Sequence, residues 1–273
     1  MKFRLIRLIK YALIPFGIIS ACFRPRKIPF VILMYHRVND GVRKELSVTR
    51  ADFRRQMDYL QKKGYRVVSL GEALSPACRE KKDKKPWVVL TFDDGYEDFY
   101  TDAFPVLSEY GYTSLLYLVP GRIGSGEVFW WDRDIGESAL MSWEQLDNLK
   151  KSGLVEFGSH SMSHPDFDRI NRDAARQELL QSKKVLEGRL SMPVRHFAYP
   201  RGIIAHQDIV GELYETAVSI FDGSSGAAHC PLDSVTRLVR MPVQRSDGPV
   251  LFAARLKGWL CAEGFIKRLI GKH

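Results

Sequence analysis

Two short polar segments combine residue types that bind metal ions and transfer protons. Asp93 and Asp94 are adjacent, His160 and His164 stand four residues apart, and each pair follows a short apolar run. Aspartate and histidine are ligands of first-row divalent metals, and one carboxylate with two imidazoles leaves coordination positions open for water and substrate. The second carboxylate is then available as a base toward that water. The pattern favours a hydrolytic metal site, whereas aspartates without a metal would most simply cap the helix that follows.

The elements that must position these residues are short strands and the turns after them. Residues 87–92 and 154–158 are apolar, rich in β-branched and aromatic side chains, and typical of buried strands. Gly95 permits a sharp turn after the first strand, and residues 96–110 are predicted to be helical. Pro165 disfavours α conformation at the residue before it, so we expect at most one helical turn around the two histidines.

Two further segments repeat this arrangement. Residues 29–36 form a predicted strand that ends at His36, and residues 195–202 break at a Pro-x-Gly sequence. Four strands thus carry Asp, His or Pro-Gly turns at the same end, which is the geometry of the active face of a β/α barrel. The alternation continues with predicted strands near 65–69, 115–119 and 216–220, and predicted helices at 50–63, 97–110, 143–152, 171–190 and 206–214.

Together these segments resemble the polysaccharide deacetylases of carbohydrate esterase family 4, the NodB-homology domain. Thr91–Gly95 reads TFDDG like the first motif of the family, and residues 160–164 match its HSxxH second motif. The likeness covers roughly residues 28–245. It implies an α/β fold, a distorted (β/α) barrel of about seven strands. It also implies a divalent metal, with zinc favoured over nickel or cobalt, and assigns Asp93 as general base and Asp94, His160 and His164 as metal ligands.

The third motif of the family departs from its usual form here. Where the family commonly reads Arg-x-Pro-Tyr-Gly, residues 198–202 read Ala-Tyr-Pro-Arg-Gly, so the arginine that usually orients the base is missing. The resemblance still implies that the backbone N–H of Arg201 is the oxyanion donor. Tyr199 and Pro200 of the same motif are expected to contact the substrate.

The general acid is expected at the other end of the domain. We find no Leu-x-His motif near the C-terminus, but Tyr35-His36 resembles the N-terminal Tyr-His motif of deacetylases acting on poly-N-acetylglucosamine exopolysaccharide. In that branch the histidine is the acid, in a circularly permuted arrangement. The resemblance implies that Asp93 deprotonates a metal-activated water, which attacks the acetamide carbonyl, and that His36 protonates the departing amine. Preference for an amide over an ester rests on the resemblance alone.

A glycine-rich loop contains two tryptophans, Trp130 and Trp131. Exposed tryptophan faces stack well on sugar rings, so this loop is a candidate substrate subsite. Packing beneath the loop is the competing interpretation.

The net charge of +9 is located in the two ends of the chain. Residues 1–27 carry seven basic residues and no acid, and residues 251–273 carry five basic residues and one acid, which leaves 29 basic against 31 acidic in residues 28–250. Nucleic-acid binding would need a basic face on the folded domain, so this class is disfavoured. We expect a basic N-terminal segment over 1–27, a catalytic domain over 28–250 and a basic amphipathic C-terminal helix over 251–273.

The N-terminal segment is predicted to contact an anionic membrane surface. As a helix it places several apolar residues on one face with Arg4 and Arg7 opposite, a pattern of interfacial helices; the apolar residues are Leu5, Leu8, Ile9, Ala12 and Leu13. Two alternatives are a signal segment and simple packing on the barrel. Ile19–Cys22 also resembles a lipoprotein cleavage box, which would attach lipid to Cys22. The C-terminal segment has the same two options, membrane contact or packing. A peripheral position at the bacterial inner membrane follows, on either its cytoplasmic or its periplasmic face.

The leading hypothesis is a metal-dependent hydrolase that removes N-acetyl groups from an N-acetylated polysaccharide or a lipid-linked sugar. The alternative is a catalytically weak sugar-binding protein on the same scaffold, which the altered third motif favours. A glycosidase is disfavoured, because its two carboxyl groups should lie roughly 5–10 Å apart across a glycosidic bond. The four cysteines are scattered and indicate neither a disulfide framework nor a cysteine metal site.

Overall fold

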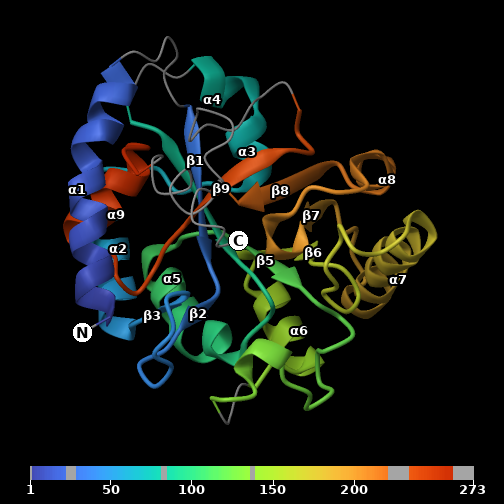
Figure 1. Cartoon of the computed structure of the whole chain (residues 1–273). Coiled ribbons are helices and arrows are strands. Elements are labelled where there is room, and N and C mark those ends of the chain that lie inside the picture. The colour runs from blue at the N-terminus through green and yellow to red at the C-terminus, as the bar shows by residue number, and fades with distance from the viewer. Residues whose placement is uncertain (1, 23–28, 81–84, 136–138, 221–233, 261–273) are drawn as a thin grey trace.

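The computed structural model describes residues 2–22, 29–80, 85–135, 139–220 and 234–260. Seven parallel strands close into a barrel in the order β1-β4-β5-β6-β7-β8-β9. The strands are β1 Phe30–Tyr35, β4 Trp87–Phe92, β5 Ser114–Leu118, β6 Val155–Ser159, β7 His196–Ala198, β8 Thr216–Ile220 and β9 Leu238–Pro242. A two-stranded sheet of β2 Arg37–Val38 and β3 Ser47–Val48 lies at the end of the barrel where β1 ends (Figure 1).

The expected barrel of about seven strands is confirmed, but one of its strands is not the one predicted. Residues 65–69 contribute only an isolated bridge between Val67 and Val88, because the chain turns there into a short helix with Ser69 as N-cap. The seventh strand is β9, which pairs with β8 and closes the barrel against β1, with Ile32 opposite Arg240. Arg240 interrupts the apolar residues of Leu238–Pro242, so the sequence did not indicate a strand there.

Helices cover the outside of the barrel (Figure 1). The predicted helices 50–63, 143–152, 171–190 and 206–214 are present, and residues 97–110 form a π-helical turn followed by α5. Polar caps start several of them: Thr49 accepts from Asp52 N–H and Asn171 accepts from Ala174 N–H. The bounds are α2 Arg50–Lys62, α3 Leu70–Leu74, α4 Pro76–Glu80, η1 Phe99–Ala103, α5 Phe104–Tyr110, η2 Trp130–Asp132, α6 Trp143–Lys151, α7 Arg172–Leu190, η3 Pro200–Gly202, α8 Gln207–Leu213 and α9 Pro249–Leu256.

The two faces of each strand belong to two parts of the core. Every residue of β1 and β4 is buried, as expected for parallel strands covered on both faces. Alternate residues such as Ile32, Val89 and Tyr117 form one cluster, whereas Leu33 and Leu90 join the cluster beneath the helices. Since side chains alternate along a strand, the series that starts at Trp87 and Val89 reaches Asp93 just beyond the end of β4.

One further helix, α1 Lys2–Cys22, runs along the side of the barrel next to α9 (Figure 1). Arg7, expected on the side of the helix opposite its apolar face, donates to the carbonyl oxygen of Ser246 on the barrel. Among the described residues, no helix is long and apolar enough to cross a membrane. Of the predicted C-terminal helix over 251–273, the structure describes only residues up to 260, and there Leu251, Phe252 and Leu256 are buried.

Candidate metal centre and active site

Asp93 and Asp94 lie at the carboxyl end of β4, where the chain leaves the barrel. Asp93 N–H donates to the carbonyl oxygen of Tyr35 at 3.1 Å, which continues the β1–β4 ladder by one residue. Asp94 then has a φ of 74° and Gly95 a φ of 83°, both in the left-handed region. This sharp change of direction separates the two carboxylates: Asp93 faces Arg240 and Asp94 faces His164. His160 Nε2 lies near both, 3.9 Å from Asp93 Oδ2 and 3.8 Å from Asp94 Oδ1.

Asp94, His160 and His164 offer ligand atoms that lie within 4.8 Å of one another. Asp94 Oδ1 is 3.8 Å from His160 Nε2 and 4.0 Å from His164 Nε2. The other ring nitrogen of His160 lies 2.8 Å from the carbonyl oxygen of Ala198. A carbonyl accepts hydrogen bonds only, so Nδ1 carries the proton and the lone pair of Nε2 faces Asp94 and His164. The three predicted metal ligands are thus brought together by β4, β6 and the loop after β6.

The loop that carries the two histidines is bent rather than helical. Ser161 and His164 have φ values of 66° and 62°, so no helical turn forms, in agreement with the expectation of at most one. Glu178 on α7 fixes this loop from outside: its Oε2 accepts from the backbone N–H groups of Met162 and Ser163, both at 2.9 Å. Its Oε1 accepts from the hydroxyl of Ser163 at 2.7 Å. The sequence analysis missed Glu178, since nothing local to it indicates its partner sixteen residues earlier.

The electrostatics of the three ligands suit a cation. Burial, with the nearby charges of Asp93 and Asp132, raises the pKa of Asp94 well above its usual value. Burial also lowers the pKa of His160, and it lowers the pKa of His164 to about 3. Oδ1 of Asp94 is buried and has no hydrogen-bond partner among the described residues. Two neutral imidazoles and a carboxylate with an unsatisfied oxygen fit a divalent metal, which would compensate the buried negative charge.

Asp93 is held by an arginine that the motif analysis did not find. Arg240 Nη1 and Nη2 lie 2.5 and 2.7 Å from the two carboxylate oxygens of Asp93, and both side chains are buried. Burial alone would raise the pKa of Asp93, but Arg240, followed by His160 and His36, lowers it to about 2. Asp93 is therefore ionised at neutral pH. The arginine missing from the third motif is replaced from β9, the strand that the sequence analysis did not predict.

His36 lies beside the base at the end of β1. Its Nε2 is 3.9 Å from Asp93 Oδ2, and its side chain is 16% exposed. Burial is the largest influence on this imidazole and lowers its pKa to about 4, although the charge of Asp93 opposes that change. His36 is therefore neutral in the free site, so an acid role requires that it acquire a proton during the reaction.

The third-motif residues lie near the end of β7. Arg201 has a φ of 56° in the short turn η3, and its side chain donates to Asp166 Oδ1 at 2.8 Å rather than pointing to Asp93. Tyr199 and Pro200 are buried. The Tyr199 ring lies edge-on to Phe197 at 5.2 Å and is 0% exposed, so it offers no face to a sugar. The substrate contact expected of the Tyr199 side chain is therefore not available in this structure.

The two tryptophans of the glycine-rich loop have different environments. Trp131 stacks on Phe129 at 4.4 Å and lies edge-on to the His164 ring at 4.8 Å, so it packs against a predicted metal ligand. Trp130 is 66% exposed. Both alternatives for this loop thus occur together: Trp131 supports the site, and Trp130 presents a free aromatic surface.

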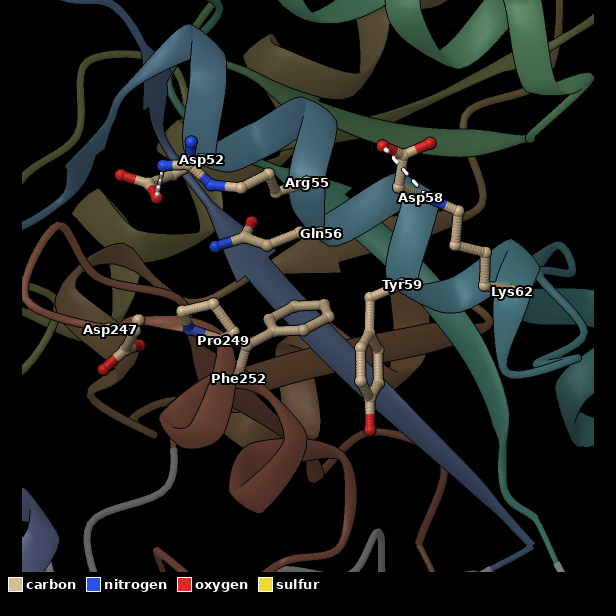
Figure 2. Close-up of a pocket in the computed structure, with 10 residues that line it drawn as sticks. Asp52, Arg55, Gln56, Asp58, Tyr59, Lys62, Asp247, Pro249 and Phe252 are labelled. Carbon is tan, nitrogen blue, oxygen red and sulfur yellow. Dashed lines mark hydrogen bonds and ion pairs between the residues drawn. The ribbon is translucent and has the colours of Figure 1, made fainter.

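A separate hollow of about 230 Å³ lies between α2 and α9 on the outer side of the barrel (Figure 2). Gln56 and Tyr59 of α2 face Pro249 and Phe252 of α9 across it (Figure 2). None of the site residues described above lines this hollow. The hollow is therefore separate from the candidate metal centre.

Comparison with known proteins is consistent with this geometry. Residues 80–215 match the family model described as polysaccharide deacetylase. YxkH of Bacillus subtilis (strain 168), whose name describes a polysaccharide deacetylase, is 28% identical over 179 residues, which cover 66% of this chain and 58% of that protein. The poly-beta-1,6-N-acetyl-D-glucosamine N-deacetylase of Escherichia coli (strain K12) is 30% identical over 137 residues, or 48% of this chain and 20% of that protein. The chain thus spans less than two thirds of either relative.

A solved structure shows the same architecture. The Streptococcus pyogenes deacetylase PplD, solved in complex with acetate, is 25% identical and superposes with a TM-score of 0.68 over 83% of this chain and 97% of that one.

Proposed function

This chain belongs to the polysaccharide deacetylase family, and we propose that it is a metal-dependent hydrolase that removes N-acetyl groups from amino sugars of a surface polysaccharide or glycolipid. The observation that carries the proposal is that an ionised carboxylate lies directly beside a group of candidate metal ligands. Asp93 is held ionised by Arg240, and directly beside it Asp94, His160 and His164 offer the ligand atoms of a candidate cation site.

The three ligands fit a divalent cation, and zinc suits one carboxylate and two imidazoles. When bound, such a metal would polarise the amide carbonyl and lower the pKa of a water molecule. Trp131 and Glu178 keep His164 and its loop in place, so the ligand geometry does not depend on the metal alone.

The protein's own residues account for the proton transfers. Asp93 accepts the proton of the attacking water as the water oxygen bonds to the carbonyl carbon. Breakage of the C–N bond releases acetate and leaves an amine that needs a proton. His36 is neutral at rest and its Nε2 lies 3.9 Å from Asp93 Oδ2, so it can relay the same proton from Asp93 to the amine. Asp93 is then ionised again, because the charge of Arg240 lowers its pKa, and it can accept a proton in the next cycle.

The proposed substrate is an N-acetylglucosamine polymer or a lipid-linked acetamido sugar. Support comes from relatives named as poly-beta-1,6-N-acetyl-D-glucosamine N-deacetylases. Trp130 offers an exposed ring at the rim of the site on which a sugar can stack.

The test is acetate release from N-acetylglucosamine oligomers and from lipid-linked acetamido sugars. Protein stripped of metal and reloaded with zinc, nickel or cobalt should release acetate only when reloaded, and Asp93→Asn should abolish release. Asp147→Asn, at a residue of α6 whose side chain is about half exposed, is the matched control and should leave activity unchanged. Stoichiometric metal binding without acetate from any of these substrates would instead support a sugar-binding protein, and release of new reducing ends without acetate would support a glycosidase.

The sugar-binding alternative depended on the incomplete third motif. Because Arg240 supplies the interaction with Asp93 that the missing arginine would have made, that argument no longer favours it.

A further inference from the structure

Helix α1 exposes its apolar side to solvent. Five large apolar residues on it are between 51% and 66% exposed, whereas a helix on the surface of a soluble domain normally turns its polar side outward. The five residues are Leu5, Leu8, Ile9, Phe16 and Ile19. They recur over almost the whole length of the helix, so we treat them as one surface, the outer face of α1.

The polar side of α1 is fixed to the barrel. Lys10 is only 2% exposed, and its Nζ donates to Gln244 Oε1 at 2.6 Å, Ser246 Oγ at 2.5 Å and Asp247 Oδ1 at 2.7 Å. An ammonium group buried with three oxygen partners cannot leave them without a large desolvation cost. This contact determines the rotation of α1 and therefore keeps its apolar side outward.

A second contact fixes the other half of the helix. A Cβ built on Gly17 would lie 1.6 Å from the carbonyl oxygen of Trp259, so only glycine permits this close approach. Ile14 packs with Leu251, Ala254 and Leu260 on the same side. Together with the Lys10 contact, these interactions make α1 a part of the folded domain.

The charges in the sequence of this segment indicate what covers the outer face. Residues 1–27 contain no acidic residue; Lys2 and Arg4 stand at the start of the helix, and Arg24, Arg26 and Lys27 follow its end. Two copies of this face would bring basic residues against basic residues, which opposes self-association. A segment with an exposed apolar face, seven basic residues and no acid is complementary in composition to an anionic lipid bilayer, with its hydrocarbon below negatively charged headgroups.

We propose that α1 lies parallel to the surface of an anionic bilayer, with its outer face among the headgroups and upper acyl chains, and that it remains part of the mature chain. The N-terminal half of α1 lies beside the loop after β9, where Arg7 donates to Ser246 O and Arg245 lies over Phe3. That loop is at the end of the barrel that carries the candidate site, and α1 runs along the side of the barrel (Figure 1). The site mouth therefore opens next to the membrane surface. This inference does not depend on the proposed activity.

The experiment measures binding of the full chain to vesicles of phosphatidylcholine alone and of phosphatidylcholine with phosphatidylglycerol. Leu8→Glu and Phe16→Glu place a negative charge at the most exposed positions of the outer face, where folding should be unaffected. Leu180→Glu, an exposed leucine of α7, carries the same change of size and charge away from α1. Thermal unfolding establishes that each variant is folded, independently of vesicle binding and of the proposed activity.

We expect the wild type and Leu180→Glu to bind anionic vesicles, more weakly at high salt, and each α1 variant to bind roughly tenfold or more weakly, since it loses burial of a large apolar side chain. Equal binding by wild type and α1 variants, or no binding by the wild type, overturns the proposal. So does a dimer in solution that dissociates in the same α1 variants, because a second copy would then cover the face. An intact mass that corresponds to a chain starting at Cys22 also overturns the proposal, because α1 would then have been removed from the mature protein.

Discussion

Arg240 and Asp93 form a buried bidentate ion pair between β9 and the end of β4, with N–O distances of 2.5 and 2.7 Å. The two residues are 147 positions apart in the chain and are brought together by closure of the barrel. A planar guanidinium fixes both oxygens of a carboxylate, so Arg240 sets the orientation of Asp93 as well as its charge.

Replacing Arg240 should therefore change both the rate and its dependence on pH. Arg240→Met removes the influence that keeps the pKa of Asp93 near 2, so the acidic limb of the profile of kcat/KM against pH should move to higher pH. Loss of the orientation should lower the rate roughly a hundredfold. Arg240→Lys retains the charge and should restore the position of the limb but not the full rate. A uniform loss of activity at every pH in both variants would contradict the role assigned to Arg240.

His36→Ala should lower kcat without removing the metal. General acid–base groups contribute on the order of 10²- to 10⁴-fold, and His36 is not among the three ligands that lie within 4.8 Å of one another. Metal content by atomic spectroscopy should equal that of the wild type, while the rate of acetate release falls. His206→Ala, a histidine bonded to the carbonyl oxygen of Ile170 away from Asp93, should leave both unchanged. Loss of metal in His36→Ala would make His36 a ligand instead.

Glu178→Gln should weaken metal binding although Glu178 touches no ligand atom. Glutamine retains one acceptor oxygen, but the carboxylate accepts three hydrogen bonds from Met162 and Ser163. Residues that hold a ligand in this way typically contribute 10- to 100-fold to metal affinity. Competition with a chromogenic chelator measures the change. Glu212→Gln, which removes an exposed ion pair with Arg176, is the control and should have no effect. Equal metal affinities for the Glu178→Gln and Glu212→Gln variants would contradict the role assigned to Glu178.

Acid should destabilise the protein partly through His196, which begins β7 and is not one of the candidate metal ligands. Burial, the largest influence, lowers the pKa of His196 in the folded state from 6.5 to about 4, and its Nδ1 is 2.8 Å from Thr216 Oγ1. Between these two pH values the unfolded chain binds a proton that the folded one does not. Stability is therefore complete above pH 6.5 and falls as the pH drops toward 4, by at most about 3 kcal/mol.

His196→Gln should reduce that dependence. Urea unfolding of the metal-free protein at pH 7 and pH 5 gives the loss of free energy for each form, and the variant should lose less than the wild type. His36 and His164 act in the same direction in both proteins, since burial lowers their pKa values too, so the difference between the two proteins isolates His196. Identical losses would show that His196 is protonated equally in the folded and unfolded states.

Local patterns in the sequence were sufficient for much of the fold. The apolar runs at Phe30–Tyr35 and Trp87–Phe92 are strands because they are buried on both faces, and the polar caps Thr49 and Asn171 start the helices predicted after them. Asp93, Asp94, His160 and His164 were recognisable because each pair follows the end of a strand, and parallel strands in a barrel bring such positions to one end.

What the sequence determined was the chemistry available at that end of the barrel: carboxylates, imidazoles and the motifs that carry them. The tertiary structure alone decided which groups act on one another. Arg240 forms an ion pair with Asp93, and Lys10 forms one with Asp247, across more than a hundred intervening residues. No local pattern in the sequence encodes such contacts. They exist because closing the barrel and docking α1 bury opposite charges together, and a buried charge is stable only beside a partner.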